Sequence, residues 1–147
     1  MRHHNYVSTR PDFTAHTDRN DQPLDLGGER RQVQFTALLV NVGLGPAIIT
    51  SARLTFDGND VVVKDRNAVQ AAVRSALNHP LQGLTVFTVA GRYGVPSNSS
   101  VRLLGLTFMA ASDVEAEGVL SRLERLHLVV NYRSVYGETF TYDSKGP

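Results

Sequence analysis

Apolar and polar side chains alternate along most of this chain, and this period of two residues is typical of β-strands. The clearest alternating segment is 32–42. One face of it carries the apolar residues Val33, Phe35, Ala37 and Leu39. The same alternation predicts strands over these further segments: 47–56, 61–63, 84–91, 101–110, 126–134 and 138–143.

Turn residues separate several of these strands. Asp57 and Gly58 form an Asp-Gly pair, which is a strong signal for a tight hairpin turn. A second turn is predicted at Tyr136 and Gly137. The aromatic residues on either side of this second turn are expected to form the buried face of a hairpin: Tyr132, Phe140 and Tyr142. A tyrosine hydroxyl bonded to the backbone near a strand corner would fit a sandwich.

Two segments change to the helical period. The first is predicted as a helix over 67–78, because its apolar residues follow the spacing of an amphipathic helix: Val69, Ala72, Val73, Ala76 and Leu77. Asn67 and Gln70 fit a capping box at its start, and Pro80 ends it. Ser112 and Glu115 fit a second capping box, before a shorter helix that Gly118 weakens.

The order of these elements predicts an all-β fold with two helical insertions. No regular strand–helix–strand alternation is present, so a parallel doubly wound sheet is disfavoured. We predict an immunoglobulin-like antiparallel β-sandwich of about seven strands over residues 32–143. Residues 1–31 are expected to form a polar N-terminal arm, with one short strand at 11–17 and a loop after it, and residues 144–147 a frayed end.

Composition narrows the functional classes. A length of 147 residues indicates one domain, and the formal net charge of +1 gives no sign of a nucleic-acid partner. There is no cysteine, which excludes disulfides, thiolate nucleophiles and iron–sulfur ligation. No apolar run reaches the ~18 residues that a membrane span needs. No signal peptide is visible at the start of the chain.

The most distinctive stretch is N-V-G-L-G-P-A, which runs from Asn41 through Gly43, Gly45 and Pro46 to Ala47. It lacks the lysine and the following helix of a phosphate-binding loop, and the proline removes a backbone donor. We therefore expect these glycines to supply a positive φ or a close backbone approach between two strands.

This junction resembles the strand junctions of bacterial immunoglobulin-like modules, including adhesion-type modules. Together with the segment Y-R-S-V-Y-G-E-T-F, from Tyr132 to Phe140, it looks like a family of uncharacterised bacterial proteins. In that family, a short extracytoplasmic β-sandwich commonly follows an N-terminal membrane helix, which this sequence lacks. The resemblance implies a periplasmic or cell-surface location, with a cytoplasmic location as the alternative. It carries no catalytic residue.

No candidate for chemistry stands out. The five histidines, at positions 3, 4, 16, 79 and 127, follow no metal-binding spacing. Two acidic loops could be considered for calcium. The spacing of the first fails the EF-hand pattern: Asp18, Asn20, Asp21 and Asp25. Turn chemistry alone explains the second: Asp57, Asn59 and Asp60. No G-x-S-x-G motif is present. We expect no enzyme activity, cofactor or metal.

The leading functional hypothesis is a non-enzymatic structural or protein-interaction module of a bacterial cell envelope or extracellular assembly. We expect it to self-associate or to bind a protein partner. The first alternative is a ligand-binding module for a glycan or calcium. The second is a packing subunit of a filament or virion, in which the N-terminal arm exchanges between subunits.

Overall fold

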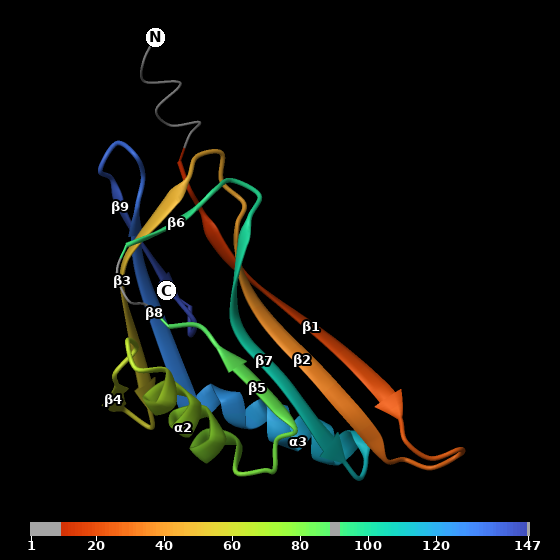
Figure 1. The fold of residues 1–147 in the computed structure, drawn as a ribbon. Helices are drawn as coiled ribbons and strands as arrows, with labels where there is room; N and C mark the ends of the chain where they lie inside the picture. Colours follow the sequence, from red (N-terminus) through yellow and green to blue (C-terminus); the bar gives the residue numbers. More distant parts are fainter. Residues whose placement is uncertain (1–9, 89–91, 147) are drawn as a thin grey trace.

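The computed structural model describes residues 10–88 and 92–146, and their fold is two antiparallel β-sheets that face each other (Figure 1). The elements in chain order are β1 (Phe13–Pro23), β2 (Arg31–Asn41), β3 (Ala47–Phe56), β4 (Asn59–Val61), α2 (Arg66–Leu77), β5 (Gly83–Val86), β6 (Tyr93–Val95), β7 (Ser100–Ala110), α3 (Asp113–Ser121), the 3₁₀ turn η1 (Arg122–Arg125), β8 (Leu126–Arg133) and β9 (Thr139–Asp143). The predicted all-β class with two helices is confirmed.

Each sheet contains strands from both halves of the chain. The first sheet has the order β1-β2-β7-β5, and the second has the order β4-β3-β8-β9. The strand β6 pairs with the first residues of β3. The strand β4 pairs with the last residues of β3, along the same edge. All of these strand pairs are antiparallel.

The two sheets form a wedge. They lie close together where the β2–β3 junction sits, which we call the narrow end, and they diverge toward α2 and α3, which we call the wide end (Figure 1). One core cluster fills the narrow end and includes Leu39, Ile49 and Tyr132. A second cluster packs the helices against the first sheet and includes Leu77, Phe108 and Val119.

The helices begin at side-chain caps. The Oγ of Ser112 accepts a bond from the backbone N–H of Glu115 at 3.2 Å, as the sequence predicts. The cap of α2 differs from the prediction, because Asp65 occupies it and accepts from the N–H groups of Asn67 and Ala68. Asp65 lies two residues before the predicted cap, so the helix begins slightly earlier than expected.

The strand β1 is longer than the sequence indicates. Residues 18–23 were expected to form a loop, yet they pair with β2 over the full length of the strand. Ion pairs stabilise this polar extension, because Arg19 contacts Asp21 at 2.8 Å and Asp113 of α3 at 3.0 Å. Residues 13–23 of the segment that was expected to form a polar arm are therefore part of the first sheet.

The predicted strand over 84–91 is shorter in the structure. β5 ends at Val86, and β6 begins at Tyr93 in the other sheet. The chain thus crosses from one sheet to the other between these strands, which alternation alone does not reveal. Residues 89–91 of the predicted strand lie outside the described residues.

Neither described helix has the length and apolarity that crossing a membrane would require.

Candidate functional site

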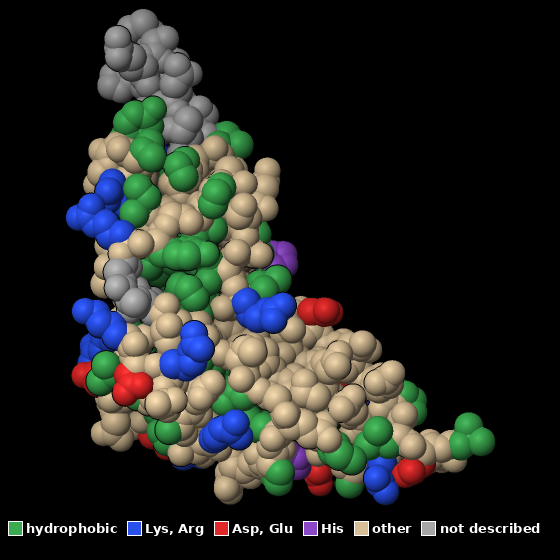
Figure 2. All heavy atoms as spheres, in the orientation of Figure 1, with side chains coloured by type: hydrophobic (Ala, Val, Ile, Leu, Met, Phe, Trp, Pro, Cys, Tyr) green, Lys and Arg blue, Asp and Glu red, His purple; other side chains and the backbone are tan. Residues whose placement is uncertain are grey.

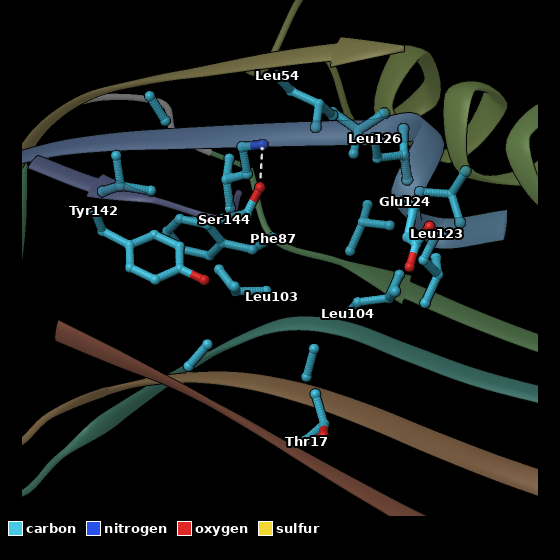
Figure 3. Close-up of a pocket in the computed structure, with 18 of the residues that line it drawn as sticks. Thr17, Leu54, Phe87, Leu103, Leu104, Leu123, Glu124, Leu126, Tyr142 and Ser144 are labelled. Carbon is cyan, nitrogen blue, oxygen red and sulfur yellow. Dashed lines mark hydrogen bonds between the residues drawn. The ribbon is translucent and has the colours of Figure 1, made fainter. Parts of the chain in front are cut away.

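A cavity of about 740 Å³ lies between the two sheets, at the level where they begin to diverge. The first sheet lines it with apolar side chains of β2, β5 and β7: Phe35, Ala37, Val86, Leu103 and Leu104. The second sheet contributes residues of β3 and β8: Ala52, Leu54, Leu128 and Val130. Val69 and Val73 of α2 also line it. So does Leu123 of η1, which points into the same space (Figure 3).

The cavity exists because the sheets diverge where some of their inward side chains are small. Three strands line it with alanines, whose short side chains do not reach far into the space between the sheets: Ala15, Ala37 and Ala52. Protein interiors are normally packed with few voids larger than a water molecule. Ligand pockets, by contrast, have volumes of about 300–1,000 Å³ and mainly apolar walls. The volume and lining of this cavity therefore fit a ligand site.

Polar side chains also line the cavity. They come from β1, η1, β9 and the residues after β9: Thr17, Glu124, Tyr142, Ser144 and Lys145. The Oγ of Ser144 accepts a bond from the N–H of Leu128 at 2.9 Å (Figure 3). These side chains give an otherwise apolar space a few hydrogen-bonding groups.

Tyr142 is the most buried of these polar groups, and its ring extends over the cavity with the hydroxyl toward Leu103 (Figure 3). Within residues 10–88 and 92–146, that hydroxyl has no hydrogen-bond partner. Burial raises the pKa of Tyr142 above its usual value of 10.0, and the nearby Asp143 raises it further. The phenol therefore stays protonated at neutral pH and can donate to a ligand.

The histidines of the described chain do not converge on a catalytic group. The alternation along its strand predicts an exposed His127, opposite Leu126 and Leu128, but the side chain is half-buried. It contacts Asp143 at 2.6 Å. The neighbouring Ser144 bonds to backbone and makes no described contact with His127. His79 contacts the carbonyl of Met109 at 2.7 Å, and His16 is exposed. His3 and His4 lie outside the described residues.

The two acidic segments considered for calcium face arginines instead. Asp21 contacts Arg19 and Arg31, and Asp25 contacts Arg30. In the second segment, Asp57 contacts Arg125 at 2.5 Å and Asp60 contacts Arg53 at 2.8 Å. Across the described ranges, no group of three or more histidine or acidic side chains could hold a metal ion.

The N-V-G-L-G-P-A junction is organised by Asn41, whose side chain is fully buried. Its Nδ2 donates to the carbonyl oxygens of Gly45 at 2.8 Å and Val95 at 3.0 Å. Its Oδ1 accepts from the N–H groups of Asp12 and Gly43, both at 3.1 Å. One amide thus joins the start of β1, the β2–β3 junction and β6, with all of its main hydrogen-bonding positions used.

The two glycines of the junction have different surroundings. At Gly43 a Cβ would lie 2.2 Å from the carbonyl oxygen of Arg10, so this position requires a close backbone approach. Gly45 is buried, and neither glycine has a positive φ. Pro46 is exposed and directly precedes β3.

The turn residues lie at the two hairpins. Asp57 and Gly58 both have positive φ, at 50° and 83°, and they connect β3 to β4 as a two-residue turn. Gly137, with φ of 87°, follows the exposed Tyr136 in the β8–β9 connection.

Tyr132 is buried at the narrow end. Its hydroxyl accepts a bond from the N–H of Phe13 at 3.3 Å, and its ring meets the edge of the Phe13 ring. The same ring stacks on Phe140 of β9. Tyr132 therefore ties β1 to the β8–β9 hairpin.

The cavity itself was not predicted. The alternation places Ala37 and Phe35 on the inner face of β2, but it does not show how far away the opposite sheet lies. A signal that could have indicated the cavity is the recurrence of alanine at inward positions of two facing strands, Ala37 and Ala52.

No family model matches the chain, and no curated protein matches it. Two solved structures are distantly similar. One is a Bordetella pertussis protein provisionally named ApaA, with 14% identity, a TM-score of 0.40, and coverage of 92% of this chain and 89% of that one. The other is a structural genomics target designated SoR45, with 14% identity, a TM-score of 0.34, and coverage of 90% and 80%. Neither likeness carries an argument about function.

Proposed function

We propose that this protein is a non-enzymatic binding module with an immunoglobulin-like β-sandwich fold, and that it holds an apolar ligand between its two sheets. The observation that carries the proposal is the cavity of about 740 Å³, which residues of both sheets and α2 line with apolar side chains. Burying apolar surface of a ligand there contributes roughly 25 cal/mol per Å². A preformed cavity also reduces the cost of ordering the protein around the ligand.

The lining favours an apolar chain over the glycan and calcium ligands considered from the sequence. Glycan sites commonly present aromatic faces and many hydrogen-bonding groups, whereas aliphatic side chains dominate these walls. Calcium takes six to eight oxygen ligands. Four of the five acidic side chains in the segments considered for calcium contact arginines: Asp21, Asp25, Asp57 and Asp60.

Binding of the neutral dye Nile red tests this proposal, because the dye becomes fluorescent in apolar surroundings. We expect saturable binding to the wild-type protein. The variant Ala37→Leu replaces a methyl group with an isobutyl group inside the cavity, and we expect it to weaken binding at least about tenfold, which is a loss of about 1.4 kcal/mol. Ala71→Leu is the matched control, because Ala71 is exposed on α2 and does not line the cavity.

Two results would overturn the proposal. One is the absence of saturable binding of Nile red and of neutral long-chain alcohols. The other is equal binding by the wild-type protein and Ala37→Leu, which would place the dye elsewhere on the surface. Circular dichroism of each variant would check that the fold is kept.

A second candidate function is the interaction module predicted from the sequence, at a cell envelope or in an extracellular assembly. It is favoured by β1, which has 11 residues and carries no strand on its outer edge within the described part of the chain. Such an edge can pair with another strand. We propose β1 of a second copy as that strand. Sedimentation should show a dimer, and a monomer at the highest soluble concentration would remove this candidate.

A further inference from the structure

A second hollow of about 240 Å³ adjoins the cavity. Its lining comes from the start of α2, from β5 and the residues after it, and from β7: Arg66, Thr85, Val86, Phe87, Thr88 and Arg102. Val86 and Phe87 also line the cavity. They lie where the edge strand β5 ends, so the two spaces meet around the end of that strand.

The hollow is cationic. Arg66 and Arg102 both line it, and no acidic side chain does. Neither guanidinium forms an ion pair or a hydrogen bond with another side chain in the described ranges. Like charges that share a small hollow repel each other, and an anion between them removes that repulsion. Lys and Arg side chains also flank the apolar side chains that reach the surface between the sheets (Figure 2).

Other arginines of the protein are already matched with acids. Arg19, Arg53 and Arg125 each contact a carboxylate at 3.0 Å or less. A guanidinium binds a carboxylate or phosphate through two parallel N–H···O bonds. The hydroxyls of Thr85 and Thr88 could add donors to the same anion.

The cavity lining also holds a lysine, Lys145, which is a weaker site for an anion. Its charge helps to lower the pKa of both Asp57 and Asp143. Lys145 is thus close to two carboxylates that compensate its charge, whereas no acidic side chain lines the arginine hollow.

We propose that the ligand is an amphiphile with one apolar chain and an anionic head, and that the head binds between Arg66 and Arg102 while the chain enters the cavity. This inference rests on the proposed function and names its ligand class. A long-chain carboxylate is the simplest member of that class. Arg66 and Arg102 then determine specificity for the head, and the cavity walls bind the chain.

Three probes with the same chain test the head group, each measured by displacement of Nile red: dodecanoate, dodecanol and dodecyltrimethylammonium. We expect dodecanoate to bind at least about tenfold more tightly than dodecanol, and the cationic probe to bind most weakly. The preference for dodecanoate should shrink as salt is added, because the hollow is open to solvent.

Substitutions of the positively charged residues test where the anionic head binds. The double variant Arg66→Gln/Arg102→Gln should reduce dodecanoate binding to about that of dodecanol and leave dodecanol binding unchanged. Arg74→Gln is the matched control, because it removes one positive charge from the exposed face of the same helix, outside the hollow. Lys145→Gln tests the cation that lines the cavity itself and should leave the preference for dodecanoate in place.

The outcomes separate this inference from the function on which it rests. If none of the three probes displaces Nile red, the proposed function itself fails. If all three bind equally well, an apolar site exists but the anionic head is wrong. If Lys145→Gln removes the preference and the double variant does not, the head binds at Lys145 and the inference is overturned.

Discussion

The narrow end and the cavity are built by the same strands, but they are filled differently. β2 contributes the fully buried Leu39 and Asn41 to the narrow end and the half-buried Ala37 to the cavity. β3 likewise contributes Ile49 to the narrow end and Ala52 to the cavity. β2 keeps one inner face along its length, whereas an irregularity of β3 between Ile49 and Ser51 lets both Ile49 and Ala52 face inward. Side-chain size and the distance between the sheets decide whether that face is packed or leaves space.

Adding carbon atoms should have opposite effects in these two regions. At the narrow end there is no room, and an added group would collide with backbone. In the cavity there is room, and an added group gains contacts.

The largest effect is expected for Gly43→Ala. The new Cβ would lie 2.2 Å from the carbonyl oxygen of Arg10 and 2.6 Å from the nitrogen of Asp12, so the backbone must shift. We expect a loss of roughly 4 kcal/mol in the free energy of unfolding, measured by urea denaturation. Gly94→Ala is the control, because no atom lies within 4 Å of its added Cβ. Equal stability of the two variants would contradict the close approach at Gly43.

Asn41→Ala should have the next largest effect. The variant would leave carbonyl oxygens of Gly45 and Val95 and the N–H groups of Asp12 and Gly43 without their side-chain partner. We expect a loss of about 3 kcal/mol in urea denaturation. Asn20→Ala, at an exposed position of β1, should change stability by less than about 0.5 kcal/mol. A small effect at Asn41 would show that the junction does not depend on this amide.

Ala37→Leu should act in the other direction. The longer side chain fills part of the cavity, and we expect the free energy of unfolding to rise by up to about 1 kcal/mol. Thermal unfolding of the ligand-free protein measures this change, with Ala71→Leu as the control. A loss of several kcal/mol would mean that the space beside Ala37 is already filled.

The smallest effect concerns pH. The Arg19 guanidinium holds the pKa of Asp21 below its usual value of 3.8, mainly through a hydrogen bond. The ionised Asp21 therefore stabilises the fold above about pH 4, and this contribution is lost as the pH falls through the lowered pKa. Asp21→Asn should lower stability at neutral pH by no more than about 1 kcal/mol.

The pH dependence of that difference is the diagnostic observation. The wild-type protein and Asp21→Asn should converge in stability at low pH, as followed by urea denaturation at several pH values. Asp18→Asn is the control, because Asp18 is an exposed neighbour on the same strand and forms no ion pair with the described residues. A difference that persists at low pH would indicate a packing effect instead of a charge effect.

Local signals predicted much of the secondary structure. The Asp57-Gly58 turn connects two strands directly, and Ser112 caps α3, because both depend on a few neighbouring residues. The extension of β1 could not be predicted in this way. Its polar residues form a strand because β2 lies beside them and α3 supplies Asp113 and Glu117 to Arg19. Asp113 and Glu117 are more than 90 residues away from Arg19 in the chain.

The candidate site was predicted only in part. The inner face of β2 follows from alternation, because successive side chains of a strand point to opposite sides. That of β3 does not, because an irregularity between Ile49 and Ser51 places Ile49 and Ala52, three residues apart, on the same side. The cavity does not follow from alternation either, because its volume depends on the angle between two sheets and on helices inserted at their wide end. The arginine hollow has the same origin. Arg66 and Arg102 come together only because α2 begins near the strands that carry Thr85 and Arg102.

The sequence by itself determined the class of elements, the inward face of most strands and the tight turns, since each depends on residues within a few positions of one another. The tertiary structure alone decided which strands share a sheet, where Asn41 finds its partners and where the sheets move apart. Those features depend on contacts between distant segments. The space that binds a ligand in our proposal belongs to this second group.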